Sequence, residues 1–255
     1  MNAWKTLKTH AKSGTSLVEM VAALLIFSIL MTMIVAVIHP ASKIFVQMQR
    51  LQYAQVILDN TLQELRGTAL EASGNGYVKI YGACSPDTDL TREEGAETGA
   101  ALEFVNSEGY AVLLSADGCP ETDIFLGSAA VGTVSKDQIP AGRLLARYYV
   151  RNAGGTYGYQ DKDGKKTARA VHAVFTDGYY MGAYLELEFS YPGTPDSTRT
   201  EADGSITEFY RCLYADLRLY SDPERTRLEA RESAVLDFRV PIKRQDGFTA
   251  QETGI

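Results

Sequence analysis

The chain has 255 residues, of which 25 are basic and 32 acidic, and its net charge is −7. The chain is acidic, and it has neither a stripe of basic residues nor a recognisable nucleic-acid-recognition motif. These features argue against a nucleic-acid-binding function. It has three histidines, and it contains no nucleophile elbow, zinc-protease motif, phosphate loop or dinucleotide fingerprint. We therefore expect neither an enzyme nor a bound cofactor.

Residues 1–14 form a short basic leader, which carries Lys5, Lys8 and Lys12 and no acid. By the positive-inside rule this end stays in the cytoplasm, and its removal would take the net charge from −7 to −10. An almost unbroken apolar run follows, Leu17–Ile38. At about 1.5 Å per residue it spans roughly 33 Å, enough to cross a hydrocarbon core of about 30 Å. The sequence therefore predicts one membrane-spanning helix over 17–38, with the rest of the chain outside.

Glu19 is the only ionised side chain in this run. A carboxylate is expensive in hydrocarbon, so an acid at this place is a functional hypothesis whose partner should be named. If the chain is cut after Gly14, Thr15 becomes the N-terminal residue and its amine is the natural partner of Glu19. The two charges would then neutralise each other within one subunit or between two.

Gly14, a short polar pair, two aliphatic residues, Glu19 and a long apolar helix resemble the cleavage and N-methylation segment of type IV prepilins and the related pseudopilins. The resemblance implies that a prepilin peptidase cuts after Gly14 and that the amine of Thr15 is methylated. It also implies that Glu19 pairs with a neighbouring subunit's N-terminus during assembly. Major pilins usually begin with Phe or Met, so Thr15 favours a minor pilin or a pseudopilin. The resemblance is residue by residue over Lys12–Val37, and beyond this segment it concerns only the expected arrangement of helix and sheet.

Two other interpretations of the apolar run remain, an ordinary single-pass anchor and a signal peptide. A conventional signal peptide has an apolar region of about 7–15 residues that ends in small residues. This run is longer and ends at His39-Pro40, so the signal peptide fits worst.

Beyond the apolar run the pattern becomes amphipathic, which predicts a single long helix over 15–70. Its second half is expected to pack on the protein's own sheet rather than in a coiled coil. Pro40 predicts a kink or local melting near Val37–His39, and Gly67 or the cluster Ser73–Gly76 is expected to end the helix. The predicted seam, with gaps of four and three residues, comprises Ile44, Met48, Leu51, Gln55, Leu58, Leu62, Leu65 and Ala69.

Residues 71–255 have the composition of a β-rich globular domain, which we expect outside the cytoplasm and with a core of its own. Several segments alternate apolar and polar residues, as antiparallel strands with one covered face do. The fold class expected is therefore α+β and pilin-like, a long N-terminal helix packed on an antiparallel sheet. The predicted strands are 77–83, 101–105, 110–115, 144–151, 156–160, 170–176, 179–191, 206–220 and 226–240.

Few other residues suggest chemistry. Two acidic segments could be calcium loops, but the spacing of the first does not match the EF-hand template and the second is equally short. Solvated loops are the preferred interpretation, so we expect no metal site. Cys84 and Cys119 are candidates for a disulfide, and Cys212 is expected to be a buried free thiol. His172 falls in an alternating strand, where a structural role is the common one. The acidic segments contain Asp87, Asp89, Glu93, Glu94 and Glu97 in one case and Asp161 and Asp163 in the other.

The function expected from these features is structural: a minor pilin or pseudopilin of a type IV pilus-like filament. It would be stored in the inner membrane with its C-terminal domain outside, and would reach a cell-surface pilus or pseudopilus after leader cleavage. The expected partners are prepilin peptidase, other pilin or pseudopilin subunits, assembly platform proteins and, before assembly, membrane lipid. The alternative is a single-pass, membrane-anchored extracellular binding module that does not polymerise.

Overall fold

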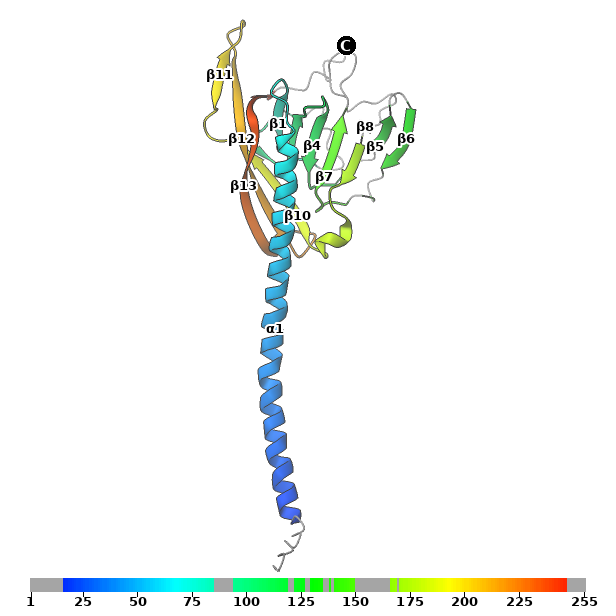
Figure 1. Ribbon diagram of the computed structural model, residues 1–255, viewed down its shortest axis with the longest axis vertical. Coiled ribbons are helices and arrows are strands. Elements are labelled where there is room, and N and C mark those ends of the chain that lie inside the picture. The colour runs from blue at the N-terminus through cyan, green and yellow to red at the C-terminus, as the bar shows by residue number, and fades with distance from the viewer. Residues whose placement is uncertain are drawn as a thin grey trace, which may run out of the picture. The chain divides into compact units, whose positions relative to one another are not determined.

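The structure is a computed structural model that describes residues 16–84, 94–118, 122–126, 129–134, 138, 140–149, 166–168 and 170–246. The chain divides into two compact units, Met1–Arg50 and Leu51–Ile255, and each is described by itself. The described residues form one long α-helix and two β-sheets, so the α+β fold class is confirmed at this level (Figure 1).

Helix α1 spans Leu17–Leu70 and contributes residues to both units. It is continuous through Pro40, so the expected melting near Val37–His39 is wrong. A proline removes one amide donor from the helical ladder, and the helix nevertheless continues beyond it to Leu70. The helix also passes through Gly67 and ends three residues later, before the Ser73–Gly76 cluster.

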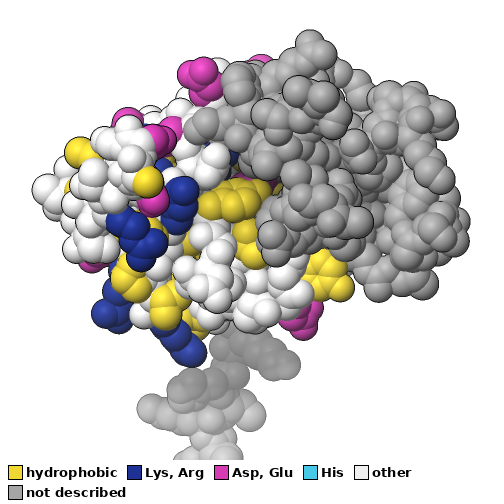
Figure 2. Space-filling model, turned by 90° about the horizontal axis from the view of Figure 1, so that it is seen from above, with side chains coloured by type: hydrophobic (Ala, Val, Ile, Leu, Met, Phe, Trp, Pro, Cys, Tyr) yellow, Lys and Arg dark blue, Asp and Glu magenta, His cyan; other side chains and the backbone are white. Residues whose placement is uncertain are grey.

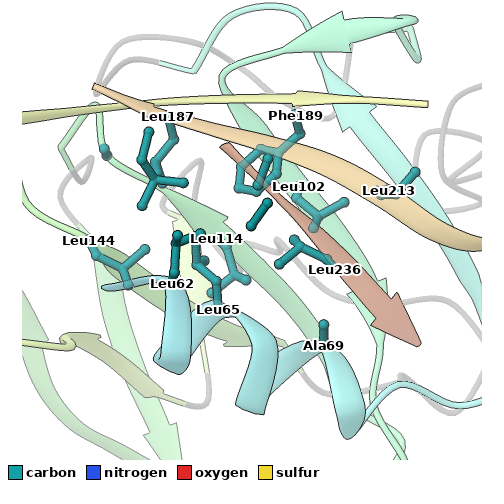
Figure 3. Close-up of a cluster of buried hydrophobic side chains, with 14 of the residues drawn as sticks. Leu62, Leu65, Ala69, Leu102, Leu114, Leu144, Leu187, Phe189, Leu213 and Leu236 are labelled. Atoms are coloured by element: carbon teal, nitrogen blue, oxygen red, sulfur yellow. The ribbon is translucent and has the colours of Figure 1, made fainter. Parts of the chain in front are cut away.

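The second half of α1 packs on the large sheet through one apolar face (Figure 1). The last four seam positions, Leu58, Leu62, Leu65 and Ala69, are buried as predicted. Figure 3 shows side chains of α1 directed into a cluster of leucines and a phenylalanine from the sheet. The buried helix residues are Ala54, Ile57, Leu58, Thr61, Leu62, Leu65 and Ala69.

Within the described part of the chain, the large sheet has ten strands in the order β2-β10-β12-β13-β1-β3-β4-β7-β9, with β11 paired to β12. A second sheet has the order β6-β5-β8, with strands Thr122–Leu126 (β5), Ala129–Val134 (β6) and Lys166–Ala168 (β8). The strands of the large sheet are β1 Tyr77–Tyr81, β2 Thr98–Gly99, β3 Ala101–Val105, β4 Ala111–Ser115, β7 Leu145–Tyr149, β9 Ala170–Ala173, β10 Tyr184–Ser190, β11 Ser197–Thr200, β12 Ile206–Tyr220 and β13 Leu228–Arg244.

The sheets are mixed and mostly antiparallel, which corrects the expectation of a purely antiparallel sheet. In the large sheet β1 runs parallel to β13, with Tyr77 opposite Lys243 and Val78 opposite Arg244. In the small sheet β5 runs parallel to β8. The β1–β13 pairing joins the first strand after the helix to the last strand of the domain, so a hairpin connection, which makes neighbours antiparallel, is not available to it.

Strands β3 and β12 have the predicted bounds, and six others fall within or across the predicted segments. The predicted strand 179–191 begins later, at Tyr184, because Asp177–Tyr180 forms a 3-10 helix (η3) and Met181 has a positive φ of 52°. Strand β13 extends beyond Val240 to Arg244, past an irregularity at which Arg239 has a φ of 63°. The predicted strand 156–160 lies outside the described residues.

Strands β10 and β12 have the single covered face that was expected, since buried and partly exposed residues alternate along them. Strands β3 and β4 do not, because all five residues of each are buried. Strands β1 and β7 are buried almost throughout as well. The centre of the sheet is therefore covered on both faces, and side chains on the second face, away from α1, are also enclosed.

Candidate assembly site

The predicted assembly residue Glu19 lies in the first turn of α1. The amide of Met20 donates to the carbonyl oxygen of Ser16 at 3.1 Å, which starts the helix. The amide of Ser16 in turn donates to Oε2 of Glu19 at 3.0 Å. This is the glutamate half of a capping box, in which an acid three residues into the helix satisfies an amide that the helical ladder leaves without an acceptor. Glu19 therefore stabilises the helix start within its own chain.

Gly14 and Thr15 lie outside the described residues, so cleavage and methylation at these positions stay predictions. The capping hydrogen bond still bears on them. The amide nitrogen of Ser16 is bonded to the carbonyl carbon of Thr15, so the carboxylate that it binds is held within a few bonds of the amine that cleavage would create. The pattern Ser-x-x-Glu before an apolar run is the sequence signal for this arrangement.

After Glu19 the helix surface is uncharged and exposed throughout Met20–Ile38, and it is apolar except at Ser28 and Thr32. The hydroxyl of Ser28 donates to the carbonyl oxygen of Leu24, and that of Thr32 to the carbonyl oxygen of Ser28, both at 2.7 Å. The polar groups of this stretch are thus satisfied inside the helix, as a lipid or protein interior requires. Among the described helices, α1 is long and apolar enough to cross a membrane.

The apolar surface does not end at Ile38. The exposed fractions of Ile44, Met48 and Leu51 are 56%, 60% and 52%, so the first half of the predicted docking seam is not buried. This corrects the expectation that the whole seam packs on the sheet. From Leu17 to Leu51 the exposed apolar surface extends over roughly 50 Å of helix at about 1.5 Å per residue, more than the roughly 30 Å that a hydrocarbon core covers.

A row of charged side chains lies on the second face of the large sheet. Lys79 of β1 is directly opposite Glu103 of β3, and Arg147 of β7 is in register with Glu103 through Leu113 of β4. The exposed fractions of Lys79 and Glu103 are 0%, and that of Arg147 is 2%. Charged residues are almost never buried to this degree unless they are paired.

The carboxylate of Glu103 is held by two tyrosine hydroxyls. Tyr77 donates to Oε1, and Tyr81 donates to Oε2 at 3.0 Å. Burial raises the pKa of Glu103, and the two hydrogen bonds and the charges of Lys79 and Arg147 oppose that rise. Because these side chains are enclosed, they are not presented to a substrate in solvent, and we assign them a structural role.

Two of the three cysteines lie among the described residues, and only the burial of Cys212 differs from what was expected. Cys84 is a buried free thiol, 3.5 Å from Nη2 of Arg147, and its candidate partner Cys119 lies outside the described residues. Cys212 is a free thiol but only half-buried, because it lies on the outer face of β12, opposite Asp237. Burial and the charges of Asp196 and Asp237 raise the pKa of the Cys212 thiol, which makes it a poor nucleophile.

The acidic segments are only partly described. Glu97 forms an ion pair with Arg244, with 2.6 Å between Oε1 and Nη2. Glu94 is exposed. No group of three or more His, Cys, Asp or Glu side chains that could hold a metal ion occurs among the described residues. The remaining acids of these segments, Asp87, Asp89, Glu93, Asp161 and Asp163, and the side chain of His172 lie outside the described part of the chain.

Basic side chains gather on one part of the described surface in Figure 2, with acidic and hydrophobic side chains among them. Several arginines on the outer face of β12 and β13 are engaged in cross-strand ion pairs. Arg211 lies 3.3 Å from Asp237, and Arg231 lies 2.8 Å from Asp216. In each pair the negative charge of the aspartate offsets the positive charge of the arginine, so this face is not uniformly electropositive.

No family model, curated protein or solved structure matches this chain.

Proposed function

We propose that this protein is a structural subunit, a minor pilin or pseudopilin, of a type IV pilus-like filament. In this proposal a prepilin peptidase removes residues 1–14, and Thr15 becomes a methylated N-terminus. The chain is stored in the inner membrane with its globular domain outside, and an assembly platform then transfers it to a filament of related subunits.

The observation that carries this proposal is the extent of the exposed apolar surface on α1. Lipid tails can cover roughly 30 Å of helix, which accounts for Leu17–Ile38 and leaves Ile44, Met48 and Leu51 in contact with headgroups or water. Large exposed apolar surfaces mark interaction sites. A bundle of helices from neighbouring subunits would cover the whole length, whereas a bilayer alone would not.

The energetics of such a transfer are near balance, because the apolar surface leaves one apolar environment and enters another. Association of helices in an apolar environment depends on packing and on polar contacts rather than on further hydrophobic burial. An ion pair between Glu19 and a neighbour's Thr15 amine would therefore contribute mainly to axial register. Its net stabilisation would be small, since desolvation offsets much of the attraction between the charges.

A membrane-anchored binding module that does not polymerise is the second candidate. The capping hydrogen bond between Ser16 and Glu19 favours it, because it gives the carboxylate a role that needs no neighbouring subunit. In this case α1 would only fix the β-rich domain to the membrane surface, and the chain would keep its leader.

Cleavage separates the two candidates. When the chain is co-expressed with a prepilin peptidase, intact mass measurement should show a product that begins at Thr15. Gly14→Val should block the cut, because a prepilin peptidase accepts little more than a hydrogen atom at this position. Ser13→Ala is the matched control and should be cut like the wild type. Recovery of an intact Met1 start beside an active peptidase would contradict the filament proposal and favour the anchor.

A further inference from the structure

A partly exposed apolar surface lies on the flank of α1 that contacts η3, within the β-rich unit. The hydroxyl of Tyr179 accepts a hydrogen bond from Nδ2 of Asn60 at 2.7 Å and lies 3.5 Å from the carbonyl oxygen of Val56. The ring of Tyr179 stacks on that of Phe175, with 4.4 Å between the centroids. On the same flank of the helix, the exposed fractions of Tyr53 and Val56 are 53% and 52%. We call the surface of Tyr53, Val56, Phe175 and Tyr179 the apolar patch.

Three exposed carboxylates continue this flank beyond the apolar patch. Glu64 lies on it, since 11 residues, or about three turns, separate it from Tyr53. Glu71 follows seven residues after Glu64, which is two turns or about 10.5 Å. The amide of Ser107 donates to the carbonyl oxygen of Glu71 at 2.7 Å, and this bond brings Glu108 beside Glu71. In the described part of the chain, none of these three carboxylates forms a salt bridge.

The complementary surface is found on the first half of this chain's own α1. Lys43 and Arg50 are the only charged side chains of residues 20–58, and both are exposed. They are seven residues apart, which is the spacing of the two glutamates on the flank described above. The residues before them, 33–38, are apolar and exposed. An apolar segment followed by two basic residues therefore matches an apolar patch followed by two acids.

A single register brings both sets of surfaces together. If two copies of α1 lie parallel and one is displaced by 21 residues, or about 31 Å, Lys43 faces the neighbour's Glu64 and Arg50 faces its Glu71. The same displacement places residues 32–39 of one copy at the level of the other copy's apolar patch. A further shift of two turns in either direction leaves one of the two basic residues without an acid at its level.

We propose that the apolar patch and the acids beyond it receive residues 32–50 of a second copy of this chain, displaced by 21 residues along α1. The two contacting surfaces are different parts of the chain, so the contact is heterologous and repeats from copy to copy. Heterologous contacts that do not close into a ring produce open filaments.

This inference rests on the proposed filament function, because two copies inserted at one depth of a bilayer are not displaced by the thickness of its hydrocarbon core. One copy has to leave the membrane before the contact forms. The pair between Glu19 and a neighbour's Thr15 amine needs a displacement of only a few residues, so it involves a different neighbour.

Crosslinking of sheared filaments with a short bismaleimide, read on immunoblots, tests the register. Lys43→Cys combined with Glu64→Cys should give a ladder of covalent oligomers, since every copy carries one position of each surface. Arg50→Cys combined with Glu71→Cys should give the same ladder. Lys43→Cys combined with Glu71→Cys is two turns out of register and is the matched control. It should remain mostly monomeric, as should the chain with only its native cysteines and the membrane fraction of every variant.

Exchange of charges tests the ion pairs separately. Glu64→Lys places two cations opposite each other and should reduce incorporation into filaments about threefold or more. Adding Lys43→Glu restores opposite charges and should recover most of the incorporation. Incorporation that stays low in this double variant would overturn the ion pairs.

The crosslinks also separate this inference from the proposed function. Filaments that contain the chain but give no ladder with either in-register pair would overturn the inference and leave the filament proposal standing. A ladder of equal strength from the out-of-register control would overturn the displacement of 21 residues. A chain that never enters filaments would overturn both the inference and the filament proposal.

Discussion

Glu103→Ala should lower the thermal midpoint of the Leu51–Ile255 unit by roughly 6–20 °C. The change removes the acceptor of the Tyr77 and Tyr81 hydroxyls, and the carboxylate directly opposite Lys79, from a site with no exposure. Breaking a buried charged pair by removing one partner costs about 3–5 kcal/mol, and each kcal/mol is worth about 2–4 °C in a unit of this size. The measurement is circular dichroism of the full chain during heating.

Two further variants show which property of Glu103 accounts for the lower thermal midpoint. Glu103→Gln keeps the shape and one acceptor oxygen but removes the negative charge, so the difference between Gln and Ala separates hydrogen bonding from charge. Glu224→Ala removes an exposed glutamate and should shift stability by less than about 0.5 kcal/mol. If Glu103→Ala were as mild as Glu224→Ala, the charged row would not be the buried network described.

Glu19→Val should leave membrane insertion and leader cleavage intact and reduce incorporation into sheared filaments at least about tenfold. Under the filament proposal the variant deprives a neighbour's N-terminal amine of its carboxylate. An unpaired charge buried among helices costs several kcal/mol, and about 1.4 kcal/mol already corresponds to tenfold. Quantitative immunoblots of the membrane and sheared fractions measure the ratio.

Glu19→Gln distinguishes the two roles considered for this side chain, a helix cap and an ion pair with a neighbour's amine. Glutamine serves in a capping box as glutamate does, so the hydrogen bond to the Ser16 amide can be kept while the charge is lost. Failure of both Gln and Val variants would assign the role to the charge. Normal incorporation of Glu19→Gln would contradict an ion pair across subunits and leave Glu19 as a helix cap.

The alternation of apolar and polar residues was sufficient to predict the elements that have one buried face and one exposed face. The period-two alternation of β10 and β12 and the last four positions of the helix seam were read correctly. The three strands of the small sheet, β5, β6 and β8, were not predicted. Strands β2 and β11 were missed as well, because they are only two and four residues long and their pairing rather than their composition makes them strands.

Long-range pairing accounts for the remaining differences. From the sequence pattern alone, Lys79 would be expected to face solvent in an alternating strand. Its register with Glu103 explains why it is buried. The parallel contact of β1 with β13 brings together segments from opposite ends of the domain, which no local signal reports. At the candidate site, Glu19 was identified from its charge, whereas its cap with Ser16 was overlooked although the spacing is local.

The filament proposal is tested most directly by the N-terminal peptide of this chain in the purified filament fraction. Filaments sheared from cells that express the full assembly system would be digested, and their peptides analysed by mass spectrometry. The account predicts a peptide that begins at Thr15, carries a methyl group on its amine and is absent from filaments of the Gly14→Val strain. A chain that stays entirely in the membrane fraction with its Met1 start, while other subunits assemble normally, would contradict it.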